Sequence, residues 1–168
     1  MTEWIEFATA IAAPGDLEPA FEALWQLTDH EIGAPLFTVM TFDQDTRLST
    51  RIWSSMPEAY PPQGTKPLPE SDWADLVLGQ QKPFVANSIE EIAGHFADHE
   101  LIQSLGCESC LNLPIVYGGR VLGTLNCLDV AGHYTPERVA HAARLVAPGA
   151  LCLLRLSEVG RLSEEPVQ

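Results

Sequence analysis

The chain has 168 residues, 46% of them hydrophobic and 19% charged, which predicts one folded domain with its own core and excludes wholesale disorder. Nine Lys and Arg against 23 Asp and Glu leave a net charge of −14, so no nucleic acid and no membrane surface is expected as a partner. An acidic start, four cysteines without a disulfide-framework pattern, and a longest apolar stretch of only Val146 to Leu154 predict a cytoplasmic protein with reduced thiols.

Two helices are predicted at the start of the chain. Apolar residues recur at helical spacing from Trp4 to Ile11 and again from Leu17 to Ile32. Pro14-Gly15 separates the two runs, because this pair breaks a helix.

A hairpin and a long loop follow. Residues 35–42 are rich in β-branched and aromatic side chains, residues 43–45 supply turn formers, and residues 47–54 form a second strand-like run. Residues 56–69 contain five prolines, which do not fit central strands. This segment is predicted as an irregular loop of the kind that often covers a binding site.

Short elements are predicted in the middle of the chain. Residues 71–78 begin with a capping serine and predict a helix, and residues 83–86 predict a strand. Residues 88–91 and 95–105 predict two further short helices.

The last third predicts a second hairpin and a long helix. Residues 109–116 and 121–128 predict strands joined by Tyr117-Gly-Gly-Arg, whose glycines accept a positive φ. Thr135-Pro136 is a capping pair that opens a helix over 135–157, with a kink expected at Pro148. The order of elements predicts an α+β domain over 1–157 on an antiparallel sheet, with a polar tail at 158–168.

One long motif resembles a known family. The run Ser109-Cys-Leu-Asn-Leu-Pro-Ile-Val-Tyr-Gly-Gly-Arg-Val-Leu-Gly-Thr-Leu-Asn-Cys-Leu-Asp129, followed by Tyr134-Thr-Pro-Glu137, is similar to the C-terminal half of GAF domains. The resemblance implies a GAF/PAS-like six-stranded antiparallel sheet. Terminal helices, often paired in a homodimer, would cover one face, and short helices and loops would enclose a small-molecule pocket on the other. It also implies a sensory or regulatory function, exerted in trans because no effector domain follows.

Some ligands known for GAF domains are not expected here. Cyclic-nucleotide-binding members carry an Asn-Lys motif, and neither Lys66 nor Lys82 follows an Asn. Bilin-binding members use a Cys-His pair, whereas Cys107 precedes Glu and Cys110 precedes Leu. Free methionine sulfoxide reductases of this family have cysteines in the loop before the same strand. Cys107 and Cys110 resemble those cysteines in position only.

Polar residues alternate along the two strongest strands. The period of two places Cys110 and Asn112 on one side of their strand, and Thr124 and Asn126 on one side of the partner strand. These four side chains are predicted to face the pocket. The other sides are predicted to face the terminal helices; they carry Leu111, Leu113, Leu125 and Cys127. Buried amides require partners, so Asn112 and Asn126 either satisfy each other or await a ligand.

The segments that would cover the pocket supply further candidates. Trp73 is a candidate pocket wall, with the alternative that it only packs in the core. His99 is also a candidate ligand contact. Lys and Arg are scarce in these segments, which predicts a neutral or cationic ligand, because an anionic one requires charge-assisted partners.

The cysteines and histidines allow a metal or redox hypothesis. His95, His99, Cys107 and Cys110 supply four zinc-type ligands within sixteen residues, although the spacing departs from the usual zinc patterns. The alternative is that the histidines line a loop or the surface and that Cys110 packs as an apolar group. Thioredoxin-like chemistry is disfavoured, because the Cys-x-x-Cys motif leads into a strand rather than opening a helix.

Three functions therefore stay open. The first is a non-catalytic, small-molecule-binding domain that dimerises through the helices at 1–12 and 135–157. The second is a thiol-dependent reductase of a small oxidised metabolite, with Cys107 or Cys110 as nucleophile. The third is an adaptor that has lost its ligand. No motif ties a serine, a histidine and an acid into one catalytic site, so no other catalytic residue is predicted.

Overall fold

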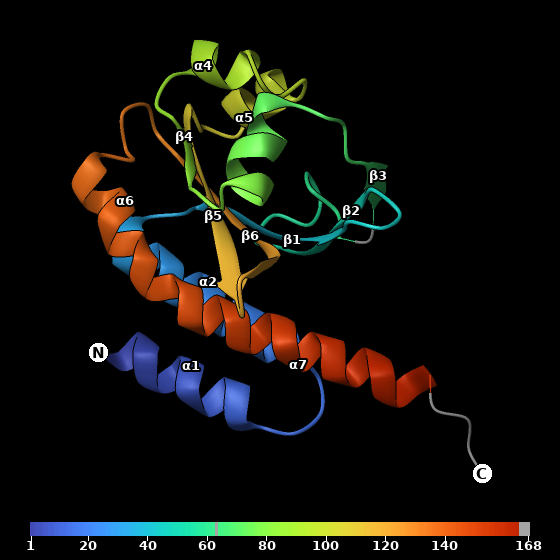
Figure 1. Ribbon diagram of the computed structural model, residues 1–168. Coiled ribbons are helices and arrows are strands. Elements are labelled where there is room, and N and C mark those ends of the chain that lie inside the picture. Colours follow the sequence, from blue (N-terminus) through green and yellow to red (C-terminus); the bar gives the residue numbers. More distant parts are fainter. Residues whose placement is uncertain (63, 165–168) are drawn as a thin grey trace.

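One antiparallel sheet forms the centre of the protein. The computed structural model describes residues 1–62 and 64–164. Its six-stranded sheet has the order β3-β2-β1-β6-β5-β4, which Figure 1 shows in side view. The strands are β1 (Leu36–Asp43), β2 (Leu48–Ser54), β3 (Thr65–Pro67), β4 (Phe84–Ala86), β5 (Ser109–Tyr117) and β6 (Arg120–Asp129).

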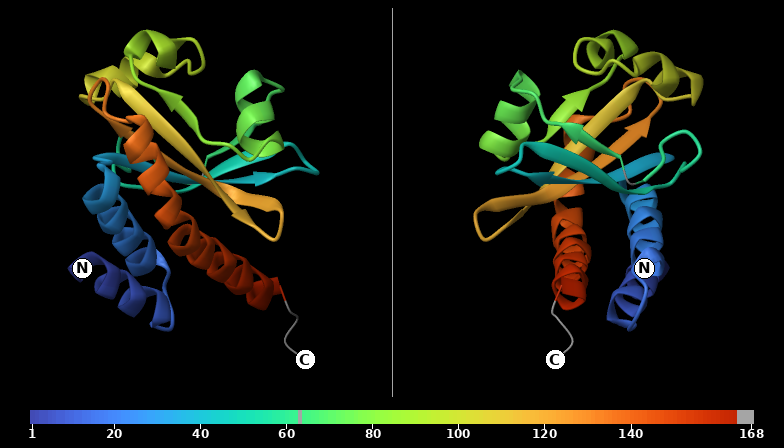
Figure 2. Two further views of the ribbon diagram at one scale, coloured as in Figure 1. Left: turned by 60° about the vertical axis from the view of Figure 1, so that its left-hand side comes forward. Right: turned by 90° about the vertical axis from the view of Figure 1, so that its right-hand side faces the viewer.

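Long helices cover one face of the sheet. They are α1 (Thr2–Ala12), α2 (Glu18–Ile32), α6 (Pro136–Ala142) and α7 (Val146–Glu164). In Figures 1 and 2 they form a separate layer, and α7 packs against β5 and β6. The main hydrophobic core lies between this helical layer and the sheet. It includes the four residues of β5 and β6 that are predicted to face the terminal helices: Leu111, Leu113, Leu125 and Cys127. Their placement confirms the period-two alternation, because successive strand residues point to opposite faces.

Short helices and loops cover the other face. They comprise α3 (Asp72–Ala74), a π-helical turn η1 (Asp75–Gly79), α4 (Ile89–Ala93) and α5 (His99–Ser104). Two of these helices begin at serine caps, because Ser71 Oγ accepts from the Ala74 N–H and Ser88 Oγ from the Glu91 N–H. The cap at Ser71 confirms the prediction. A second, smaller core lies beneath them and includes Cys110 and Leu128.

The proline-rich segment is not wholly irregular. It contains β3, which pairs with β2 through Leu48 and Pro67. This strand lies at the edge of the sheet. Proline is tolerated at an edge because its missing N–H does not have to donate to a further strand.

Two predicted helices have different bounds. The helix predicted over 95–105 begins only at His99, and His95 lies before it with its ring 4.7 Å from that of Phe84. The C-terminal helix is divided by a 3-10 turn, η2 (Ala143–Leu145), before Pro148 rather than at it. Proline has no N–H to donate to the carbonyl four residues earlier, so the irregularity falls on the preceding turn.

The C-terminal helix is also longer than predicted. It continues beyond residue 157 to Glu164, while residues 165–168 of the predicted tail lie outside the described residues. Within the described ranges, Pro136–Gly160 is long and apolar enough to cross a membrane by length and composition. The core helix of a soluble protein passes the same test, and Leu145 and Cys152 are fully buried against the rest of the domain.

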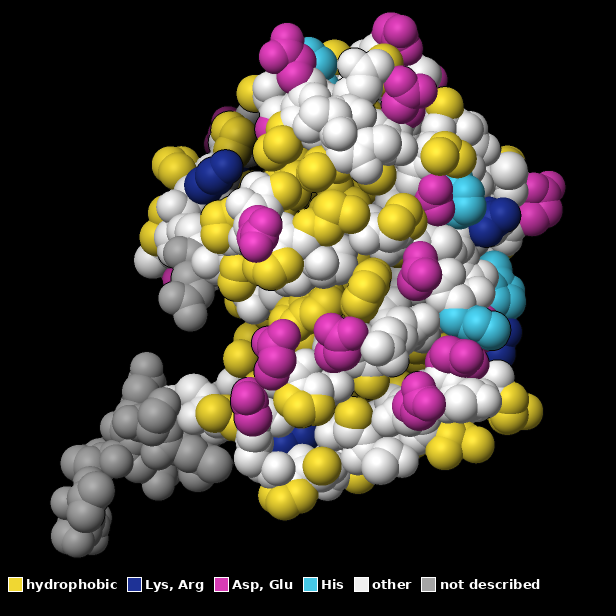
Figure 3. Space-filling view, turned by 180° about the vertical axis from the view of Figure 1, so that it is seen from behind, with side chains coloured by type: hydrophobic (Ala, Val, Ile, Leu, Met, Phe, Trp, Pro, Cys, Tyr) yellow, Lys and Arg dark blue, Asp and Glu magenta, His cyan; other side chains and the backbone are white. Residues whose placement is uncertain are grey.

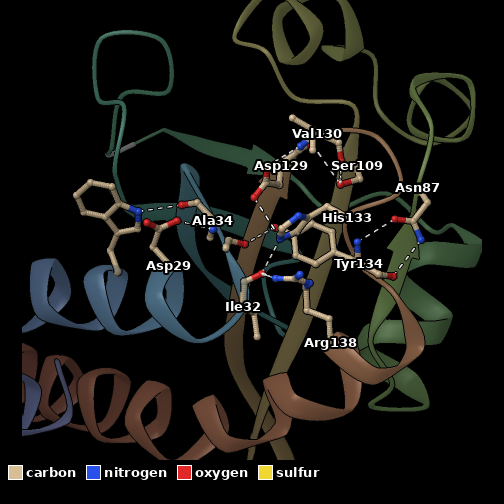
Figure 4. A network of polar contacts seen from close by, with 12 residues as sticks. Asp29, Ile32, Ala34, Asn87, Ser109, Asp129, Val130, His133, Tyr134 and Arg138 are labelled. Carbon is tan, nitrogen blue, oxygen red and sulfur yellow. Dashed lines mark hydrogen bonds and ion pairs between the residues drawn. The ribbon is translucent and has the colours of Figure 1, made fainter. Parts of the chain in front are cut away.

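A polar junction ties the end of α2 to the start of α6. Ile32 O accepts from Arg138 Nη1 at 3.0 Å and lies 2.7 Å from His133 Nε2. Figure 4 draws both contacts. The Tyr134 hydroxyl donates to Gly33 O, and the Tyr134 backbone exchanges two hydrogen bonds with the Asn87 side chain. These bonds satisfy carbonyl groups at the end of α2 and connect the helical layer to the loop before α4.

Candidate functional site

A cavity lies between the sheet and the layer of short helices. Its volume is about 100 Å³, and a wider cleft of about 420 Å³ shares part of its wall. The floor comes from β1, β2, β5 and β6, and Phe96, Asp98 and Ile102 close it from above. Figure 3 shows the rear of the molecule, where hydrophobic side chains are visible in the hollows of a surface scattered with acidic groups.

A chain of hydrogen bonds crosses this site. Trp73 Nε1 donates to Asn112 Oδ1 at 2.8 Å, and Asn112 Nδ2 donates to Asn126 Oδ1 at 2.9 Å. Asn126 Nδ2 then donates to Thr38 Oγ1 at 3.2 Å. The strand register dictates this order, since Asn126 lies opposite Asn112 on one side and Thr38 on the other. The two amides therefore satisfy each other, and we call this chain the polar relay.

The predicted pocket residues fall into two groups. Cys110, Asn112 and Asn126 line the cavity, and Trp73 lines the wider cleft. Thr124 lies on the same face of the sheet but is fully buried and lines neither space.

His99 does not line the cavity or the cleft. Its Nδ1 lies 3.2 Å from the carbonyl oxygen of Phe96, so the ring bonds to its own turn. Across the described residues, no group of three or more His, Cys, Asp or Glu side chains is placed to hold a metal ion. The zinc hypothesis on His95, His99, Cys107 and Cys110 therefore lacks a converging ligand set.

The cysteines are placed as packed thiols. Cys107 and Cys110 are both free and buried in the smaller core. Burial raises the pKa of the Cys107 thiol to about 11 and that of Cys110 to about 12. A nucleophilic thiol requires a lowered pKa, so this arrangement opposes the reductase hypothesis.

Arg51, Tyr60 and Asp98 also line the cavity, and neither of the two charged residues among them is predicted from the sequence as a ligand contact. The Arg51 guanidinium carbon lies 4.8 Å from the centre of the Tyr60 ring, and Arg51 Nη1 donates to Pro61 O at 3.3 Å. The Tyr60 hydroxyl donates to Asp98 Oδ2 at 2.6 Å. Burial, followed by the hydrogen bond to Asp98, raises the pKa of Tyr60.

A bulge in β2 turns Arg51 toward the cavity. In the β1–β2 pair, Val39 lies opposite Trp53 but Met40 lies opposite Arg51, so Ile52 is an extra residue. Trp53 packs in the main core with Val39. Without the bulge, Arg51 would share that face with Trp53; with it, Arg51 turns to the cavity beside Met40.

Comparison with known proteins identifies similar domains. The family model described as GAF domain matches residues 17–153 of this chain. A comparison with curated protein sequences finds no significant match.

Solved structures with a similar fold agree with that match. The GAF domain from a phosphoenolpyruvate-protein phosphotransferase of Coxiella burnetii is 15% identical with a TM-score of 0.68, covering 95% of each chain. The GAF domain of a two-component sensor histidine kinase from Bacillus halodurans is 14% identical with a TM-score of 0.65, covering 86% of this chain and 98% of that one. The cyanobacteriochrome TePixJ GAF domain is 19% identical with a TM-score of 0.63, covering 88% and 94%. At these identities the likeness concerns the fold.

Proposed function

Since the chain belongs to the GAF domain family, we propose that it is a sensory or regulatory domain that binds a small molecule in this cavity without transforming it. The observation that carries the proposal is the polar relay in the wall of a largely apolar cavity. Ligand sites are typically apolar spaces with a few fixed polar groups that orient the ligand. The raised thiol pKa values support the non-catalytic form of the proposal.

The relay leaves polar capacity for a ligand. Each Asn amide has two N–H donors, and Asn112 and Asn126 each use one of them within the relay. Both side chains line the cavity, so the second donor of each is the group proposed to meet an acceptor on the ligand. Cys110 would contribute apolar contact, and Trp73 would respond to ligand through its bond to Asn112.

Asn112→Leu tests the proposal. The variant removes one acceptor and two donors from the cavity wall, so we expect ligand binding to be lost while the domain stays folded. The measurement is a thermal-shift screen with a metabolite panel, followed by titration calorimetry. The buried partners Trp73 Nε1 and Asn126 Oδ1 lose their bonds, so a stability loss of about 1–3 kcal/mol is expected as well.

Asn87→Leu is the matched control. It also removes side-chain hydrogen bonds, both to Tyr134, but Asn87 does not line the cavity. We expect a comparable loss of stability with binding intact. If Asn112→Leu binds the same ligand as strongly as the wild type, the cavity is not the binding site.

We also propose that the domain acts in the cytoplasm as a homodimer formed through α1 and α7. Apolar side chains on both helices face solvent, with Ile5 62% and Leu151 50% exposed. Sedimentation velocity at micromolar concentration is expected to give a dimer, and Leu151→Glu a monomer. Tyr117→Glu, at the tip of the β5–β6 hairpin, removes an equally exposed apolar residue and should leave the dimer intact. A monomeric wild type would refute this assembly.

A further inference from the structure

Two opposite charges line the same cavity. Arg51 and Asp98 border both the cavity and the adjoining cleft. Within the ranges that the structure describes, neither forms an ion pair with another residue. Arg51 is half-buried and Asp98 is exposed, so the lack of a protein counter-ion weighs most for Arg51. An opposite charge brought by a ligand would give each group the partner that the described residues do not supply.

One edge of the Arg51 guanidinium has no hydrogen-bond partner among the described residues. Its Nη1 donates to Pro61 O, and its guanidinium stacks on Tyr60, which together fix the plane of the group. Its Nε is buried and has no hydrogen-bond partner among the described residues. The Nε and Nη2 donors share the other edge of the guanidinium, and two parallel N–H groups of this kind match the two oxygens of a carboxylate.

The Asp98 side chain does not cap α5. It occupies the N-cap position of α5, where an aspartate normally accepts from the first turn, yet its side chain makes no cap bond. Instead Oδ2 accepts from the Tyr60 hydroxyl, and the carboxylate borders the cavity. Oδ1 has no partner in the described part of the chain, so the carboxylate can accept from a cationic donor.

The rest of the wall is largely apolar. Leu36, Ile102 and Leu128 line the cavity between these polar groups. A ligand that satisfies the site therefore carries a carboxylate, an ammonium group and a short apolar part. Such a molecule has no net charge, which agrees with the predicted neutral ligand.

We propose that the cavity binds a small zwitterion of the free amino acid class with an apolar side chain. Its carboxylate would lie on the Nε–Nη2 edge of Arg51 and its ammonium group on Asp98, with Tyr60 holding both residues in place. This inference rests on the proposed function, since it names the ligand class of the same cavity.

Titration calorimetry with matched probes tests the ligand class. The probes are L-alanine, L-valine, L-leucine and L-methionine, each with its amide, which lacks the carboxylate, and its N-acetyl form, which lacks the ammonium group. At least one zwitterion is expected to bind, and its two capped forms at least tenfold more weakly. Capped forms that bind as well as the zwitterion would overturn the inference.

Two charge variants assign the roles. Arg51→Gln should weaken the zwitterion at least tenfold and leave the affinity for its amide unchanged. Asp98→Asn should weaken the zwitterion likewise and leave the affinity for the N-acetyl form unchanged. Arg47→Gln and Asp72→Asn remove one positive and one negative charge at positions that do not line the cavity, and both variants should bind the zwitterion with wild-type affinity. Equal weakening by the control variants would overturn the assignment.

The outcomes separate this inference from the proposed function. If no zwitterion binds but another metabolite does, and Asn112→Leu abolishes that binding, the ligand class is wrong and the sensory function stands. If no compound of any charge class binds, both proposals fail. Circular dichroism and a melting curve on each variant confirm that lost binding is not lost folding.

Discussion

Thr124 carries a buried hydroxyl without a hydrogen-bond partner in the described structure. It is fully buried, and its Oγ1 has no hydrogen-bond partner among the residues described. Thr38 lies on the neighbouring strand β1, and its hydroxyl accepts from Asn126 at 3.2 Å. Two buried threonines on one face of the sheet thus differ in whether their polar atom is satisfied.

This difference predicts opposite effects of the same substitution. Thr124→Val removes an unpaired buried hydroxyl and keeps the β-branched shape, so the free energy of unfolding should rise by about 1 kcal/mol. Thr38→Val leaves the Asn126 amide without its acceptor, so the free energy of unfolding should fall by about 1–3 kcal/mol. Urea unfolding measures both. A loss of stability in Thr124→Val would show that its hydroxyl has a partner.

Among single residues, alternation explains part of the site. The period of two in a strand predicts that Asn112 shares a face with Cys110 and Asn126 a face with Thr124, and the resemblance to GAF domains implies a pocket on that face. Arg51 could not be placed in this way, since one bulge residue, Ile52, reverses the faces of β2 on either side of it. His99 does not line the cavity, whereas Asp98 and Ile102, four positions apart at the start of α5, do.

At the scale of elements, the junction between α2 and α6 depends on a glycine. Gly33 ends α2 with a φ of +76°. A Cβ there would lie 2.8 Å from Asp129 Oδ2 and closer still to the ring of His133. Gly15, between α1 and α2, has a φ of +91° but open space around the same position.

The two glycines separate backbone strain from steric overlap. Gly15→Ala is expected to cost about 1–2 kcal/mol, because L-residues rarely adopt a positive φ. Gly33→Ala should cost about 1–3 kcal/mol more, since His133 must move away from Ile32 O. Thermal unfolding of both variants gives the comparison. Equal costs would mean that the His133 contact adds nothing to the junction.

The junction also connects the two faces of the sheet. Asn87, in the loop before α4, holds the backbone of Tyr134, and the Tyr134 hydroxyl holds the end of α2 (Figure 4). The layer of short helices that closes the cavity is therefore bonded to the layer of long helices. This connection gives a proposed route from the cavity to the helices that would form the dimer.

At the scale of the whole molecule, four buried cysteines make stability depend on pH. Burial raises the pKa to about 11 for Cys107 and to about 12 for Cys110 and Cys152, and it raises that of Cys127 also. In the unfolded chain a thiol ionises near pH 8.5. Above that pH the unfolded state loses protons that the folded state keeps, so the folded state becomes less stable.

The free energy of unfolding should therefore be insensitive to these thiols below about pH 8 and should fall between about pH 9 and 11. Each thiol contributes at most about 1.4 kcal/mol per pH unit. Urea titrations with a reductant at several pH values measure the slope. Cys152→Ala should make that slope less steep, because one of the four thiols no longer contributes to it. A wild-type free energy of unfolding that is unchanged up to pH 10.5 would contradict the raised thiol pKa values.

The sequence by itself determined the alternating faces of β5 and β6, the serine and threonine caps, and the order of elements that indicates an α+β domain. These features depend on neighbours within a few residues, so local periodicity and capping chemistry are sufficient to predict them. Only the tertiary structure decided which charged residues complete the cavity. Tyr60 meets Asp98 across 38 positions of sequence, and a bulge turns Arg51 toward both. The tertiary structure also decided that His95 and His99 do not converge with other ligands on a metal site among the described residues. Such contacts depend on how the sheet and loops pack in space, which no local pattern of residues encodes.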